Sequence, residues 1–249
     1  MAKIVWDAEG YKRFETGVDH GVLYPKASTA VALPGNPSLG TTHFTNGVAW
    51  NGLTSVSKSP SGAEANDIYA DNIKYASLRS AETFGGTIEA YTYPDEFDAC
   101  NGIAALGDSV VGATAGQQSR KKFGLCYRTK IGNDTQGNDY GYKLHLVYGC
   151  SAKPSARTHS TVNNSPEAEE LSFEITSDPV VASSSSSETL KPLCYIEIDS
   201  TKFTTVDQKA LLAALEKKLY GDPESATQSG GMPYLPLPSE VRTTLTPAG

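Results

Sequence analysis

Alternation between apolar and polar positions is the dominant pattern along this chain. In its clearest stretch, Lys143 and His145 interleave with leucines and tyrosines. A period of two is the pattern of a β-strand that buries one face against a core. The alternation predicts strands at residues 87–93, 123–131 and 141–149.

Two of these strands are predicted to form a hairpin. The second and third enclose residues 132–139, which are rich in glycine and asparagine and should form their turn. Another hairpin is predicted between residues 46–50 and 53–57, because only Asn51-Gly52 separates them, a dipeptide typical of two-residue turns. With further strands expected at 171–176 and 194–199, the sequence predicts a mainly β fold.

One helix stands out after the strands, from about Val206 to Leu219. Thr204 and Asp207 resemble a capping box at its start, and Gly221 is placed to end it. We expect this helix to lie across one open side of the β domain. Its apolar face is formed by Leu211, Leu212, Leu215 and Leu219.

Three parts are expected along the chain. Residues 1–44 are interrupted by glycines and prolines and are predicted to be an N-terminal arm. Residues 45–221 would form the β domain, and the proline-rich residues 222–249 an extended C-terminal tail. The serine run at 183–187 is predicted to be a mobile loop.

Two exposed segments are predicted to make contacts between copies of the chain. The N-terminal arm carries aromatic side chains that are costly to leave in water, so it should dock on its own domain or on a neighbouring copy. Residues 59–67 are expected to be an exposed loop, and 68–78 a returning strand or extended segment, which together make a long protruding loop. The predicted contact residues are Trp6, Tyr11, Phe14, Ser59, Ser61, Glu64, Asp67 and Tyr69.

Charge and composition narrow the classes of function. The net charge of −7 and the pI near 5.1 argue against a surface built to hold nucleic acid. The basic cluster Arg120-Lys121-Lys122 is better explained as a solvated strand end. No stretch resembles a signal peptide or a membrane span, so we expect the protein to be made and folded in the cytoplasm.

No catalytic residue, metal site or cofactor is expected. The four cysteines lie far apart, and no histidine has a second ligand at metal spacing. Nucleophile elbows, phosphate loops and dinucleotide fingerprints are missing from the sequence. Asp95, Glu96 and Asp98 could serve glycoside hydrolysis or bind Ca²⁺, but acidic residues also suit the first turn of a short helix.

Six blocks of the sequence are more informative as an ordered set than any one of them is alone. They are residues 6–24, 47–53, 69–75, 90–97, 123–134 and 141–149. The block at residues 47–53, for example, reads Gly47-Val48-Ala49-Trp50-Asn51-Gly52-Leu53. In content and order they resemble the major tail protein, or tail tube protein, of long-tailed siphophages and related prophages. The resemblance covers most of the chain, from residue 6 to about residue 220.

The resemblance implies a structural virion protein. Tail tube proteins form a β-sandwich or barrel flanked by a helix, and they assemble as hexameric rings whose strands join into a continuous inner barrel. The rings stack along a tape-measure protein, with tail terminator and baseplate proteins as further partners. Double-stranded DNA would pass through the tube without specific binding, and the protein would be located in the virion tail. The sequence leaves open which strand face lines the channel.

Two other classes of function stay open at this point. A carbohydrate-binding β-sandwich on a phage or cell surface would use exposed tyrosines such as Tyr93, because aromatic rings can stack on sugars. A glycoside hydrolase would use Asp95 or Glu96. The resemblance and the lack of catalytic motifs favour the structural protein over both.

Overall fold

The computed structural model describes residues 4, 6–27, 31–33, 36–39, 43–62, 64–79, 82–107, 110–162, 164, 168–181, 191–222 and 231–247. The serine run at 183–187, predicted to be a loop, lies outside these residues. The fold is mainly β, as predicted, and every strand pair is antiparallel.

The main sheet has eight strands in the order β5-β1-β12-β13-β14-β9-β6, and β15 also pairs with β13. Its strands are β1 (Phe14–Pro25), β5 (Val48–Trp50), β6 (Leu53–Lys58), β9 (Phe84–Ala90), β12 (Phe123–Asn133), β13 (Gly137–Ala152), β14 (Leu171–Ser177) and β15 (Tyr195–Asp199).

The remaining elements are short strand pairs and helices. The pairs are β2 (Val31–Leu33) with β3 (Asn36–Leu39), β4 (Phe44–Thr45) with β16 (Tyr234–Leu235), β7 (Ala65–Ala70) with β8 (Ile73–Arg79), and β10 (Ala104–Ala105) with β11 (Thr114–Ala115). The helices are η1 (Asp95–Phe97), α1 (Asp98–Asn101), η2 (Ser200–Lys202), α2 (Val206–Tyr220) and α3 (Pro238–Leu245).

The long strand β13 divides the main sheet into two layers. One edge of β13 pairs with β15 over residues 143–147 and with β14 over residues 150–152. Between these stretches lies Gly149, with φ of +62°, and a Cβ on it would lie 2.4 Å from the carbonyl oxygen of Asp178. The first layer therefore contains β1, β12, β13 and β15, with the short β5 paired to residues 21–23 of β1, and the second contains β14, β9 and β6.

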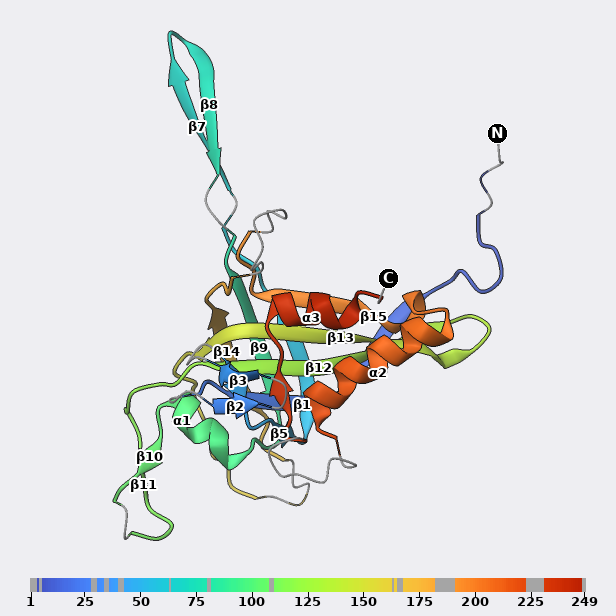
Figure 1. Ribbon diagram of the computed structural model, residues 1–249. Coiled ribbons are helices and arrows are strands. Elements are labelled where there is room, and N and C mark those ends of the chain that lie inside the picture. The colour runs from blue at the N-terminus through green and yellow to red at the C-terminus, as the bar shows by residue number, and fades with distance from the viewer. Residues whose placement is uncertain are drawn as a thin grey trace.

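Two hydrophobic cores lie on opposite faces of the first layer. The interlayer core joins Leu125 and Val147 to Ile88 and Phe173 of the second layer. The helix-side core contains Cys126, Leu144, Leu146, Leu215 and Leu219, among others, and lies under α2 and α3 (Figure 1). We predicted strands with one buried face, but β12 and β13 bury both faces along much of their length.

The hairpin of β12 and β13 is confirmed, with a shorter turn than predicted. Pairing continues as far as Asn133 opposite Gly137. The Asn133 side chain tightens the turn, because its Oδ1 accepts from the backbone N–H of Gln136 at 2.6 Å. The predicted strands at 171–176 and 194–199 also exist, as β14 and β15.

The prediction of a hairpin at Asn51-Gly52 was wrong, although both of its strands exist. β5 pairs with β1, and β6 pairs with β9, at opposite ends of the strand order. Two residues link these ends, so the sheet must roll until its two ends lie close together. Leu53 closes the gap, since a Cβ on Gly21 of β1 would lie 2.3 Å from its Cδ1 atom.

The predicted helix is confirmed as α2, but its cap lies one residue later than expected. Thr205 is the N-cap residue, and Gln208 completes the capping box, in place of Thr204 and Asp207. The buried side of the helix is formed by Leu212, Leu215 and Leu219.

Both predicted chain ends need correction. Residues 14–25 form β1 inside the main sheet, so they do not belong to an arm over 1–44. Leu23 and Tyr24 are fully buried on opposite faces of β1. Because each face packs against a different core, consecutive residues of this stretch are apolar. Part of the C-terminal tail is helical rather than extended, because α3 buries Val241 against the helix-side core.

Candidate functional site

The hairpin of β7 and β8 is the most prominent projection, and it stands away from the main sheet (Figure 1). Its turn residues, Asp71 and Asn72, have positive φ values of 50° and 62°. Two consecutive positive φ values are typical of the type I′ turn, which asparagine and aspartate tolerate well. The expected protrusion is therefore present, but it is a paired hairpin rather than a loop. The Asp-Asn pair was the sequence signal that could have identified it.

The two faces of this hairpin differ in chemistry. Residues directly opposite each other in an antiparallel pair share a face. Ile68 lies opposite Ala76, Ala70 opposite Ile73, and Asn66 opposite Leu78, so three large apolar side chains share one face. Ile68, Ile73 and Leu78 are 41%, 65% and 57% exposed. We call Ile68, Ala70, Ile73, Ala76 and Leu78 the apolar hairpin face. Tyr69 and Lys74 lie on the opposite face.

Residues 59–67 only partly form the predicted exposed loop. Ser59 donates its backbone N–H to Gly85 at 2.8 Å, and Ser61 bridges Thr83, so both serines are held against the segment that leads into β9. Asp67 is already part of β7 and contacts Lys74 at 2.8 Å. Glu64 and Tyr69 are exposed, at the base and near the tip of the hairpin.

The N-terminal contact residues lie on a different side of the molecule from the hairpin (Figure 1). Trp6 is 80% exposed and Tyr11 is 75% exposed, while Phe14 packs over Gly132. The segment is anchored by the Gly10 backbone N–H, which donates to Asp134 at 3.0 Å. One chain therefore does not bring together the two predicted groups of contact residues.

A second apolar projection was not identified from the sequence. The segment between β10 and β11 exposes Leu106, Val110 and Val111, the last at 99%. It lies at the end of the molecule opposite the β7–β8 hairpin (Figure 1). The pair Val110-Val111 within a glycine-rich stretch is the signal that could have found it. We call the described residues 103–107 and 110–116 the lower loop.

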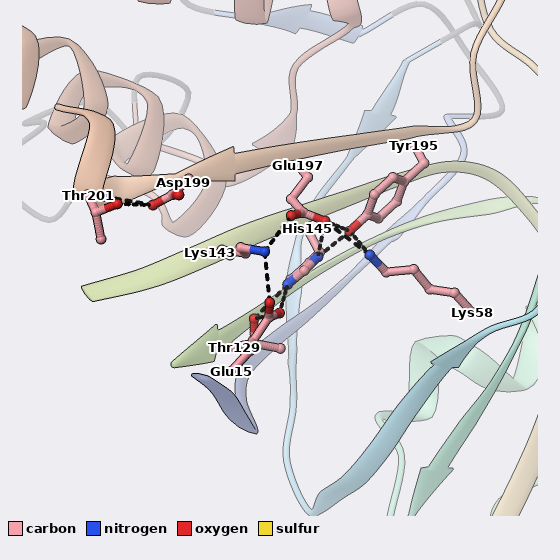
Figure 2. Close-up of polar contacts among 9 residues, drawn as sticks. All are labelled: Glu15, Lys58, Thr129, Lys143, His145, Tyr195, Glu197, Asp199 and Thr201. Atoms are coloured by element: carbon pink, nitrogen blue, oxygen red, sulfur yellow. Dashed lines mark hydrogen bonds and ion pairs between the residues drawn. The ribbon is translucent and has the colours of Figure 1, made fainter. Parts of the chain in front are cut away.

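A polar network crosses the first layer from one outer strand to the other (Figure 2). The ammonium group of Lys143 on β13 lies 2.8 Å from carboxylate oxygens of both Glu15 on β1 and Glu197 on β15. Lys58 of β6 joins the network 3.2 Å from Glu197. Its ammonium group also lies 4.0 Å from the ring centroid of Tyr195. The network thus connects strands of both layers.

His145 is the buried centre of this network (Figure 2). Its Nε2 is 2.7 Å from the hydroxyl of Thr129, and its Nδ1 is hydrogen-bonded to the hydroxyl of Tyr195. The imidazole stacks on Tyr127 with ring centroids 4.5 Å apart. Burial, assisted by the positive charge of Lys58, lowers the pKa of His145 to about 4. The imidazole is therefore neutral at pH 7.

The carboxylates of the network are ionised. Burial acts to raise the pKa of Glu197, but hydrogen bonds from Lys143 and Lys58 outweigh it and lower that pKa to about 2. The pKa of Glu15 is lowered for the same reason, with burial opposed by Lys143 and Thr129. The network is a set of matched charges that connects strands of the two layers.

One outer edge of the first layer, and much of the other, lacks a strand partner in the described part of the chain. Within the described residues, the stretch 14–20 of β1 pairs only with β12, and β15 pairs only with β13. Such edges present backbone N–H and C=O groups that can pair with another chain. They form the second candidate surface for assembly.

The residues considered for chemistry do not form a common site. Asp95 and Glu96 lie in η1, and Asp98 begins α1. Tyr93 contacts Phe97 and Phe173 edge to face, so its ring is part of the core margin. Among the described residues, no group of three His, Cys, Asp or Glu side chains could hold a metal ion. In the same part of the chain, no helix is long and apolar enough to cross a membrane.

Comparison with known proteins leaves the family unassigned. No protein-family model matches the chain, and a search of curated proteins gave no match.

Proposed function

We propose that this chain is the structural subunit of a phage tail tube, which forms rings that stack into a conduit for double-stranded DNA. The observation that carries the proposal is the order β1-β12-β13-β15 in the first layer, in which, among the described residues, the outer edge of β15 and the stretch 14–20 of β1 have no strand partner. Four consecutive antiparallel strands give the two outer strands opposite directions.

This even number of strands permits ring closure. When copies are placed side by side, β15 of one copy runs antiparallel to β1 of the next, so the sheet can continue with the same pairing pattern. The contact is heterologous, because two different edges meet, and such contacts generate rings when the rotation closes. Closure would also remove the exposed edges, which are a risk in any isolated β protein.

Charge supports a channel that conducts DNA without holding it. The net charge of −7 makes the subunit repel phosphate, whereas clustered lysines would retain it. The ionised carboxylates of Glu15 and Glu197 both pair with Lys143. The ammonium group of this lysine is therefore already neutralised and is not available to bind phosphate.

Projections and apolar chain ends support stacking of the rings. The β7–β8 hairpin and the N-terminal residues expose large apolar side chains with no second layer to bury them. The carbohydrate-binding alternative is not supported by a comparable observation, because Tyr93 packs against the interlayer core.

Electron microscopy and sedimentation of the purified protein test this proposal. Rings and tubes built from the 26.4 kDa chain are the expected result at high concentration or with tail partners added. A strict monomer under both conditions would overturn the proposal. Glycan-array binding by that monomer would favour the carbohydrate-binding alternative.

A shortened hairpin provides the matched variant. Replacing residues 63–81 by Asn-Gly places a two-residue turn next to the existing bridge between Ser61 and Thr83, so the domain should stay folded. Rings without long stacks are expected. Normal tubes from this variant would show that the hairpin does not take part in stacking.

A further inference from the structure

The β7–β8 hairpin and the lower loop lie at opposite ends of the same chain, and both expose apolar side chains (Figure 1). Two different surfaces at opposite ends allow a head-to-tail contact, which continues indefinitely when it does not close on itself. We propose that the apolar hairpin face of one copy packs against the lower loop of a second copy in the next ring. This inference rests on the proposed function and names the partner of the hairpin.

The apolar side chains are complementary in kind and reach. The strands β7 and β8 are six and seven residues long, which corresponds to roughly 20 Å at about 3.3 Å per residue. Side-by-side packing of hairpin and loop would cover Ile68 and Leu78 with Leu106 and Val111. Burial of such side chains is favourable by about 1.5–3 kcal/mol each when complete.

Charge is complementary as well. Asp71, exposed at the tip of the hairpin, has no ion pair within the described part of the chain. Arg120 and Lys121 are exposed where the lower loop leaves the domain, and they likewise lack an ion pair among the described residues. The base of the loop is ordered there, since the Lys121 backbone N–H donates to Ala99 at 3.0 Å. A hairpin lying along the loop would bring Asp71 to this basic pair.

The two faces of the hairpin allow a matched cross-linking experiment. Ile68→Cys with Val111→Cys is compared with Tyr69→Cys with Val111→Cys, because Ile68 and Tyr69 are neighbours on opposite faces. All four native cysteines are buried, so a short bifunctional maleimide should react at the new thiols. Assembled tubes of the first variant should give a ladder of linked subunits on a denaturing gel. The control variant should give much less.

The outcomes separate this inference from the proposed function. Tubes without a ladder, or a stronger ladder from Tyr69→Cys, would overturn the pairing and leave the tube proposal intact. Absence of rings and tubes from the unmodified protein would overturn the tube proposal itself.

A charge-reversal pair gives a second, independent measurement on exposed residues. Asp71→Lys should reduce the length of the tubes. Adding Lys121→Glu should restore them at least in part, because the two new charges attract. A double variant that assembles no better than Asp71→Lys would contradict the contact.

Discussion

Glu15 and Glu197 lie on the two outer strands of the first layer, yet their carboxylates contact the same ammonium group. Each has an oxygen 2.8 Å from Nζ of Lys143. The lysine therefore spans the layer between the two edges that we propose to join in a ring.

Replacing this lysine should destabilise the fold. Lys143→Met leaves two carboxylates facing each other, and loss of one partner of a partly buried charge network costs about 1–3 kcal/mol. Urea unfolding measures the change in the free energy of unfolding. Lys153→Met is the control, because Lys153 pairs with Glu174 on the exposed surface and should change stability by about 0.5 kcal/mol or less. Equal effects of the two variants would contradict the structural role of Lys143.

Stability should depend on pH through His145. The pKa of its imidazole is about 4 in the folded state, against an ordinary 6.5, so between these values the unfolded chain binds the extra proton. The contribution is complete above pH 6.5 and is lost as the pH falls from 6.5 to 4, by about 3 kcal/mol at most. His145→Gln should flatten the pH dependence of urea unfolding in this window. An unchanged slope would show that His145 does not titrate as described.

Gly149 should be intolerant of any side chain. Its φ of +62° is unfavourable for L-residues, and an added Cβ would lie 2.4 Å from a carbonyl oxygen. Gly149→Ala is therefore expected to reduce the free energy of unfolding by about 1–3 kcal/mol. Gly116→Ala is the control, since nothing lies within 4 Å of its added Cβ. Thermal unfolding of the two variants distinguishes the positions.

Docking of α2 should depend on its buried leucines. Leu215 is fully buried in the helix-side core, and Leu215→Ala should cost about 2–5 kcal/mol through lost burial and a cavity. Val206→Ala is the matched surface variant, because Val206 is 84% exposed on the same helix. Its effect on urea unfolding should stay within about 0.5 kcal/mol. Similar losses from both would mean that α2 does not pack as described.

Local sequence patterns predicted the positions of the strands and the helix well, but they predicted poorly which strands pair with each other. The residues around Asn51-Gly52 form two strands, as expected, but those strands pair at opposite ends of the sheet. A two-residue turn signal reports only local backbone geometry. It cannot report that the sheet rolls until its ends meet, because that depends on strands distant in sequence.

The candidate contact residues also divide into those that the local sequence identifies and those that only the folded structure reveals. Trp6, Tyr11 and Tyr69 were predicted as contact residues because they are aromatic, and all three are exposed, while their contacts stay a prediction. The lower loop was missed, since Val110 and Val111 have no periodic pattern and become notable only when the fold leaves them uncovered. The network around His145 was also missed, because its members come from five strands, β1, β6, β12, β13 and β15.

By itself, the sequence determined that this chain is mainly β, that its hairpin lies at β12 and β13, and that one amphipathic helix covers a sheet. These features depend on residues within one element or on neighbouring elements. Tertiary structure decided which strands pair, which faces are buried and which edges stay open. Those properties arise from contacts between segments far apart in the chain, such as Glu15 with Lys143, and no local pattern encodes them.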